Sequence, residues 1–379
     1  MTPLVLKTCK KKLSNVCSVL VKIFRIRFGY LHAASVGHLA LEADVSYINS
    51  KFIKSLTIWV TTEGIANKEL LKLISNKMII IRSPILRKVL MPIIKVTRTT
   101  KLDGNAKVNE ISSNVQDNAE ISFPFLRDIS FELHHLLKKM NLDSYQKYIC
   151  VIVRDDLHST VNGSRDSAFA TTYRNSNIDD YIKAIEFFVD SGFGVIRMGR
   201  LAKPIKFTMH GFFDYANSEL RSDVNDLLIL SNCAFAFSTL SGIDEIPNLF
   251  RRPVYIANYL PVGFFRISKL RPLILPKGLR DITSGRILSM KEIYDKGLWT
   301  ANNTQSYIRA NVEYVDCDAN TLVKFAAQVV QDFKNDSSSL DMVSYNKVQN
   351  FFVLASEVPN ELRNKVPTVS SLWLNYEQR

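Results

Sequence analysis

The chain has 379 residues, with 49 lysines and arginines against 36 aspartates and glutamates, and 46% of its residues are hydrophobic. This composition excludes a disordered chain, which buries too little apolar surface, and a polytopic membrane protein, which carries fewer charges. The length predicts two domains. The five cysteines form no CxxC pair, which argues against a disulfide framework and a cysteine zinc site and favours a cytoplasmic protein.

The positive charge is concentrated in the first hundred residues. Residues 1–100 contain 17 lysines and arginines and 4 acidic residues, whereas residues 101–379 contain 32 of each. This imbalance favours an anionic partner; the alternative is a solvated basic surface without a partner. The basic segment Lys7–Lys12 and the apolar stretch Val16–Phe28 predict peripheral contact with the cytoplasmic face of a membrane. Nucleic acid is not an expected partner, because the sequence contains no known binding module.

Strands and helices alternate along the first part of the chain, which predicts a parallel sheet. The expected strands are Ile23–Phe28, ended by Gly29, then Leu56–Thr61 and Met78–Ile81, with helices His38–Asn49 and Lys68–Ser75 between them. The polar stretch Thr99–Ser122 lacks large apolar residues and predicts a linker or long surface loop.

The alternation returns in the second part of the chain. After a helix at Phe131–Met140, the expected strands are Tyr148–Val153, Gly194–Met198, Ala234–Phe237 and Pro253–Ala257. The expected helices run from the N-cap Asn177 to the stop at Gly192, over Asp223–Leu230, from Ser241 through Phe250, and over Asn320–Phe333. The sequence therefore predicts an α/β fold with two Rossmann-like domains, residues 1–125 and 126–379, that face a cleft.

Small and polar residues follow one predicted strand of the second domain and begin the next helix. Ser238, Ser241 and Gly242 lie at this turn, and ligands of open α/β sheets bind at the carboxyl ends of strands. The free N–H groups and the dipole of a helix N-terminus suit a diphosphate, and Glu245 is placed to accept hydrogen bonds from a ribose. The alternative is that Ser241 is only an N-cap and Glu245 its capping partner.

Arginines follow other strands of the same predicted sheet. Arg154 and Asp155 come directly after one buried strand, and Arg197 and Gly199 end the next. Arg174 closes a long polar segment that is typical of a functional loop. A guanidinium at such a strand end binds phosphate oxygens, so these residues together predict an anion site; a surface Arg–Asp pair is the alternative for Arg154.

These motifs carry a resemblance to known proteins. The chain resembles a family of bacterial glycosyltransferases found among genes for surface-polysaccharide synthesis, through Arg174–Ile185, Gly192–Gly199 and Asp226–Gly242. More distantly, Val153–Asp155 and Asp226–Ser241 are similar to the donor-domain motifs of GT-B fucosyltransferases. The resemblance implies a GT-B-like fold, a nucleoside-diphosphate sugar bound at Arg154, Ser238 and Ser241, and no requirement for a metal. The chain departs from the fucosyltransferase pattern at Ile152 and Asp155.

A glycosyltransferase also needs a base for the acceptor hydroxyl. His38 follows the first strand, on the acceptor side of such enzymes, and is a candidate for this base; Asp155 is a second candidate. A helix-capping or partly buried histidine is the alternative for His38. No metal site and no cofactor are predicted, because the adjacent His134 and His135 diverge on a helix and Asp318 of the sequence Asp-Cys-Asp suits a helix cap.

The sequence thus predicts a glycosyltransferase that moves a sugar from a nucleoside-diphosphate sugar to a glycan or lipid-linked acceptor. Two other functions fit the same residues. A sugar-nucleotide epimerase of this fold would use the same strand ends, and a non-catalytic scaffold of a polysaccharide assembly would retain them without turnover.

Overall fold

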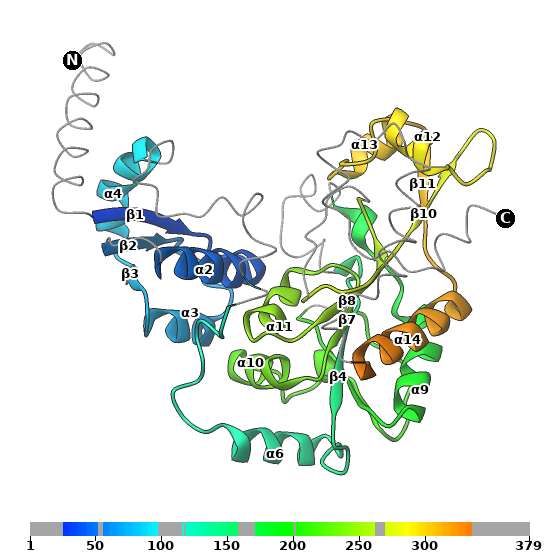
Figure 1. Cartoon of the computed structure of the whole chain (residues 1–379), viewed down its shortest axis with the longest axis horizontal. Coiled ribbons are helices and arrows are strands. Elements are labelled where there is room, and N and C mark those ends of the chain that lie inside the picture. Colours follow the sequence, from blue (N-terminus) through cyan, green and yellow to red (C-terminus); the bar gives the residue numbers. More distant parts are fainter. Residues whose placement is uncertain are drawn as a thin grey trace. The chain divides into compact units, whose positions relative to one another are not determined.

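The computed structural model describes residues 26–51, 56–97, 116, 119–157, 171–200, 202–261 and 270–335. They form two compact units: the first extends to Arg127 and includes Leu249–Arg251, and the second contains the remaining described residues from Asp128 (Figure 1). Each unit contains a parallel sheet with helices, so the predicted α/β class with two Rossmann-like units is confirmed. Within the described residues, no helix is both long and apolar enough to cross a membrane.

Several sequence predictions fall wholly or mainly outside the described residues. These are the basic segment Lys7–Lys12, the apolar stretch Val16–Phe28 up to residue 25, residues 99–115, 117 and 118 of the polar stretch Thr99–Ser122, and residues 158–170 of the polar segment before Arg174.

The first unit has a three-stranded parallel sheet in the order β1-β2-β3. Its strands are β1 (Ile26–Leu31), β2 (Leu56–Thr61) and β3 (Ile79–Ile81), and its helices are α2 (Val36–Lys51), α3 (Lys68–Ser75) and α4 (Pro84–Thr97). Helix α3 begins where predicted because the side chain of Asn67 accepts a hydrogen bond from the N–H of Leu70 (2.7 Å).

Strand β1 passes through Gly29 instead of ending there. Trp59 of β2 lies beside Gly29 in the sheet, and a Cβ atom at position 29 would overlap the indole ring. On the opposite face, Phe28 and Val60 pack against Ile94 of α4. The predicted end of the strand at Phe28 was therefore wrong: the glycine makes room for a buried tryptophan within the strand.

The predicted linker is anchored where it is described. Gln116 and Ser122 are buried, and both donate hydrogen bonds to the carboxylate of Asp44 in α2, with 2.7 Å between Gln116 Nε2 and Asp44 Oδ2. Arg251, in the same unit, forms an ion pair with this carboxylate (2.8 Å). A buried carboxylate needs such partners, so Gln116 and Ser122 belong to the packed interior, whereas Glu120 and Ile121 between them are exposed.

The second unit is built on a six-stranded parallel sheet in the order β6-β5-β4-β7-β8-β9. The strands are β4 (Tyr148–Ile152), β5 (Gly194–Arg197), β6 (Phe212–Phe213), β7 (Ala236–Ser238), β8 (Val254–Tyr259) and β9 (Ile274–Pro276). The antiparallel pair β10 (Gly278–Asp281) and β11 (Val312–Val315) forms a second, small sheet.

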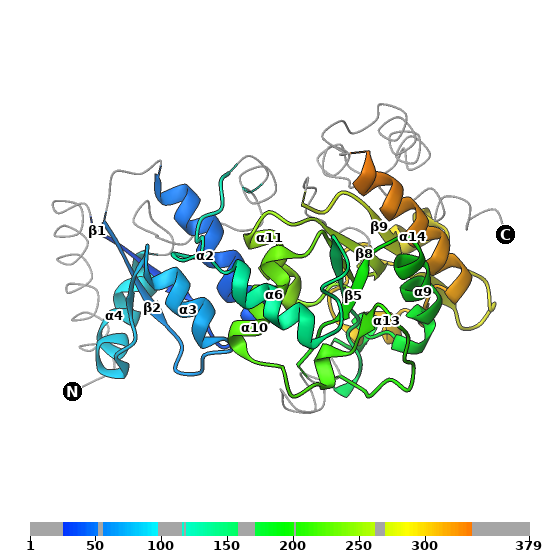
Figure 2. The same ribbon diagram turned by 90° about the horizontal axis from the view of Figure 1, so that it is seen from below.

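Helices cover both faces of the large sheet (Figure 2). The helices of this unit are α6 (Ser130–Lys139), α9 (Ile182–Asp190), α10 (Asp223–Asn232), α11 (Glu245–Leu249), α12 (Met290–Asp295), α13 (Thr304–Arg309) and α14 (Ala319–Lys334), with Leu249 itself counted in the first unit. On the face covered by α9 and α14, aromatic rings interlock: Phe237 lies 5.2 Å from Phe188 and 5.6 Å from Phe325 between ring centroids.

Two predicted helices begin with a tighter turn. Asn177 caps a 3-10 turn, Ile178–Tyr181, before α9 starts, and Gly192 (φ +91°) follows its end as predicted. The helix predicted from Ser241 through Phe250 consists of a 3-10 turn, Gly242–Asp244, followed by the five-residue α11. The predicted helix is therefore present but short, and its first turn is a 3-10 turn capped by Ser241.

Replacing Gly29 with alanine should destabilise the first unit. The added methyl group has no space beside the Trp59 ring, and overpacking of this kind costs about 1–3 kcal/mol or more. Urea unfolding followed by Trp fluorescence measures the loss. Gly64→Ala is the matched control, because a Cβ atom there lies 3.8 Å from the nearest side-chain atom, an ordinary contact; equal unfolding midpoints for the two variants would contradict the prediction.

Candidate functional site

The order of strands in the large sheet marks one position as a ligand site. The chain moves outward from β4 to β5 and β6, and then returns to β7 and moves outward in the opposite direction. Loops that leave the carboxyl ends of β4 and β7 thus diverge, and α/β proteins bind ligands in the resulting crevice. Arg154 follows β4, and Thr239 and Leu240 follow β7.

Hydrogen bonds hold Arg154 in place at this switch point. Its backbone N–H donates to Thr239 Oγ1 (2.9 Å), which ties the two diverging loops together. Its guanidinium donates from Nε to Asn175 Oδ1 (3.2 Å) and from Nη2 to Thr171 Oγ1 (2.7 Å). A guanidinium carries five N–H donors, so these bonds fix its plane and leave further donors for a ligand.

Arg174 lies close by and binds the loop after β7. Its Nε and Nη2 both donate to the carbonyl oxygen of Leu240, at 3.2 and 2.5 Å. Leu240 has a φ of +64°, in the left-handed region that leucine rarely adopts. Such backbone strain persists only where surrounding contacts impose it, and it is concentrated at ligand sites.

The two guanidinium groups are not neutralised within the described part of the chain. Neither Arg154 nor Arg174 has a described carboxylate within ion-pair distance. Burial, together with the neighbouring charge of Arg174, lowers the pKa of Arg154 to about 10. Two adjacent cations that are partly removed from water bind an anion favourably, because the anion relieves their mutual repulsion.

A buried lysine holds a residue that binds Arg154. Lys277, directly after β9, donates from Nζ to the carbonyl of Asn175 (2.5 Å) and pairs with Asp316 Oδ1 (2.6 Å). Burial lowers the pKa of Lys277, although Asp316 opposes the change. Lys277 thus positions Asn175, which in turn holds Arg154.

The cap prediction for Asp318 is confirmed: its side chain accepts hydrogen bonds from two N–H groups at the start of α14.

The polar residues at the end of β7 and directly after it mainly stabilise the loop itself. The buried Ser238 hydroxyl donates to Asp244 Oδ1 (2.6 Å), and the N–H of Ser241 donates to Asp244 Oδ2 (2.8 Å). Burial raises the pKa of Asp244 to about 6. Glu245 accepts a hydrogen bond from Arg271 (2.9 Å). The capping partner of Ser241 is therefore Asp244, not Glu245, and Gly242 begins the short turn between them.

Arg197, the last residue of β5, has a different environment from Arg154. Arg197 is fully buried, with its Nη1 3.2 Å from Asp214 Oδ2 and its Nη2 4.0 Å from Asp155 Oδ2. Asp155 also accepts hydrogen bonds from the N–H groups of Leu157 and Lys203. This arrangement gives Asp155 a role in fixing loops and places Arg197 in the interior. Gly199 likewise packs against alanine side chains of its own unit.

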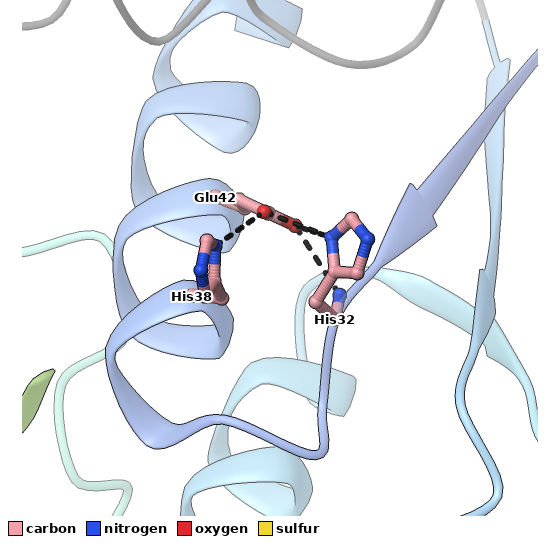
Figure 3. Close-up of side chains that lie close together, drawn as sticks. All are labelled: His32, His38 and Glu42. Atoms are coloured by element: carbon pink, nitrogen blue, oxygen red, sulfur yellow. Dashed lines mark hydrogen bonds and ion pairs between the residues drawn. The ribbon is translucent and has the colours of Figure 1, made fainter. Parts of the chain in front are cut away.

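His38, the predicted base, lies in the first turn of α2 rather than in a loop. Its Nδ1 is 3.0 Å from Glu42 Oε1, one helical turn later, and the Nδ1 of His32 is 2.9 Å from the same oxygen. Figure 3 shows the carboxylate between the two imidazoles. Burial raises the pKa of Glu42, but the hydrogen bonds with His38 and His32 outweigh it and lower the pKa overall.

Several residues of these sites were not predicted as site residues. Glu42 had a usable signal, since residues i and i+4 of a helix share a face. His32 had a weaker one, its place directly after a strand. Thr239 and Lys277 had only their places at strand ends, and the left-handed conformation of Leu240 has no signature in the sequence.

No family model and no curated protein sequence matches the chain. Among solved structures, it is similar to ADP-heptose heptosyltransferase II of E. coli (11% identity, 65% of this chain, 89% of that chain, TM-score 0.37). It is also similar to a glycosyl transferase of family 9 from Veillonella parvula (10% identity, 82% of this chain, 98% of that chain, TM-score 0.40). Another similar structure is E. coli heptosyltransferase WaaC with ADP (11% identity, 62% of this chain, 88% of that chain, TM-score 0.29). Likenesses this distant carry no function to this chain.

Replacing Arg154 with alanine should weaken the binding of pyrophosphate. A charged hydrogen bond contributes about 1.5–3 kcal/mol, so the dissociation constant should rise roughly tenfold to a hundredfold. Isothermal titration calorimetry measures the affinity. Arg280→Ala is the control, because Arg280 is exposed and pairs with the exposed Glu313. Equal affinities for the Arg154 and Arg280 variants would contradict an anion site at the switch point.

Proposed function

We propose that the chain is a glycosyltransferase that uses a nucleoside-diphosphate sugar as donor. One observation carries the proposal: Arg154 and Arg174 lie together at the switch point of a parallel sheet, with no described carboxylate paired to either. A diphosphate supplies the two negative charges that this pair lacks. The resemblance of the surrounding sequence motifs to glycosyltransferases supports the same assignment.

The chemistry of sugar transfer explains why a cationic pair is useful here. The bond between the anomeric carbon and the diphosphate oxygen breaks, and negative charge accumulates on the leaving group. Fixed guanidinium donors stabilise this charge without reorganising, and the effect is strongest where water is excluded. Arg154 meets this condition, since three hydrogen bonds fix its backbone and guanidinium and it is partly buried.

The acceptor hydroxyl must lose a proton as its oxygen bonds to the anomeric carbon. We assign this step to His38. Glu42 accepts a hydrogen bond from Nδ1, which selects the tautomer in which Nε2 takes the proton. The resemblance to fucosyltransferases favours direct displacement with inversion.

The acceptor that we propose is a glycan or a lipid-linked glycan at the cytoplasmic face of a membrane. Helix α4 supports contact with an anionic surface. Its side chains Ile85, Leu86 and Val89 are 75%, 48% and 60% exposed, Lys88 is also exposed, and the helix contains no acidic residue. Exposed apolar side chains beside cations are typical of helices that bind the membrane interface.

Replacing His38 with alanine should reduce sugar transfer and leave donor binding intact. A general base contributes about 10²–10⁴-fold, so kcat should fall by this factor. Donor binding is measured by thermal shift with UDP, GDP, CMP, dTDP and their sugar conjugates; a nucleotide at 100 times its Kd stabilises the fold by about 2.7 kcal/mol. Sugar transfer is then measured by mass spectrometry of the acceptor glycan. The donor in this assay is the sugar conjugate of the nucleotide that gives a thermal shift.

Two further variants separate the roles in this experiment. Arg154→Ala should reduce the nucleotide shift, because its weaker binding leaves the same nucleotide concentration closer to the Kd, and His134→Ala, on α6, should change neither binding nor transfer. A chain that binds no nucleotide would contradict the donor site. Conversion of the donor to an isomeric sugar nucleotide without any acceptor would instead identify an epimerase. Normal nucleotide binding with no turnover would identify a scaffold.

Replacing Ile85 and Val89 with serine should weaken binding to vesicles that contain anionic lipid. The loss follows from the apolar area removed, and the net charge is unchanged. Co-sedimentation with vesicles of phosphatidylglycerol and phosphatidylcholine measures the bound fraction. Val224→Ser is the control, because Val224 is exposed on α10 of the other unit; equal binding by both proteins would argue against contact through α4.

A further inference from the structure

Three metal-ligating side chains converge at the carboxyl end of β1. His32 follows the strand directly, and His38 and Glu42 lie one turn apart on the same side of α2 (Figure 3). The ligand atoms of all three lie within 4.8 Å of one another. No other such group of three histidine, cysteine or acidic side chains occurs among the described residues.

The spacing of these atoms fits a small ion of tetrahedral preference. His32 Nδ1 and His38 Nδ1 lie 2.9 and 3.0 Å from Glu42 Oε1. In a tetrahedral zinc site with bonds of about 2.0–2.1 Å, neighbouring ligand atoms are roughly 3.3 Å apart. A shift of a few tenths of an ångström, within the reach of side-chain rotation, therefore opens the cluster enough to admit the ion.

A backbone hydrogen bond and a neighbouring aromatic ring also hold the three side chains in place. The backbone N–H of His32 donates to Glu42 Oε2 (3.2 Å), and the Tyr30 ring meets the His32 imidazole edge-on, with 4.7 Å between centroids. Such supporting contacts orient ligands before an ion arrives. The side chains of His32 and His38 are 46% and 65% exposed, so an ion enters from solvent and keeps positions for water.

We propose that His32, His38 and Glu42 form a binding site for a divalent transition-metal ion, with zinc as the representative case. Two imidazole nitrogens and one carboxylate oxygen are a ligand set of open zinc sites, whose fourth position holds water or an oxygen of a substrate. On binding, each imidazole coordinates through Nδ1 and carries its proton on Nε2.

The site has a consequence for transfer that rests on the proposed function. An imidazole that coordinates through Nδ1 and is protonated on Nε2 accepts no further proton. Metal binding and the base role therefore exclude each other at His38. A chain loaded with zinc should transfer sugar at least tenfold more slowly than the chain freed of metal.

The first test measures binding in the absence of donor and acceptor. The full chain is treated with a chelator, dialysed and titrated with Co²⁺, which reports a tetrahedral site through its visible absorption, and with Zn²⁺ by calorimetry. We expect one ion per chain, and roughly tenfold or weaker binding after His38→Ala or Glu42→Gln. His135→Ala, on α6, is the matched control and should bind normally.

Several outcomes would overturn the metal site. These are an absence of binding, equal binding by the Glu42 and His135 variants, and a thiolate charge-transfer band that assigns the ion to cysteine. Circular dichroism confirms that each variant is folded. Since this test uses no nucleotide, its failure is distinct from failure of the donor site. Transfer that is equally fast with and without zinc would overturn the exclusion between the metal and the base.

Discussion

The second unit depends on the parallel pairing of β4 with β7. This pairing brings the starts of two diverging loops together, and the bond from the Arg154 N–H to Thr239 Oγ1 closes the junction between them. The guanidinium of Arg154 then takes its direction from Asn175, which Lys277 holds through its carbonyl. Beside this junction Leu240 adopts a left-handed conformation, and its carbonyl accepts hydrogen bonds from Arg174.

The distribution of acidic residues decides which cations face a ligand. Five carboxylates near the described strand ends have a basic or hydroxyl partner inside the unit: Asp155 and Asp214 with Arg197, Asp244 with Ser238, Glu245 with Arg271, and Asp316 with Lys277. Because these charges are compensated, the positive potential of the site comes from the two arginines without a described carboxylate partner. A buried charge is costly unless paired, which favours a ligand that completes the pairing.

The two units place different chemistry at their strand ends. The end of β1 carries imidazoles and a carboxylate, which hold or move a proton and bind transition metals. The ends of β4 and β7 carry guanidinium groups and hydroxyls, which bind anions. The proposed function assigns the base to the first set of side chains and the diphosphate site to the second.

The sequence by itself determined those helices and strands whose periodicity and caps are local: β2 and α3 begin and end where the pattern indicated, whereas α4, β6, β9–β11, α12 and α13 were not predicted. It also located Arg154 and Arg197 at strand ends, where they look equivalent. Only the tertiary structure separated them, since the partners of Arg197 are carboxylates from other loops whereas Arg154 meets amide and hydroxyl oxygens. Pairing of this kind depends on contacts between distant parts of the chain, which local patterns do not encode.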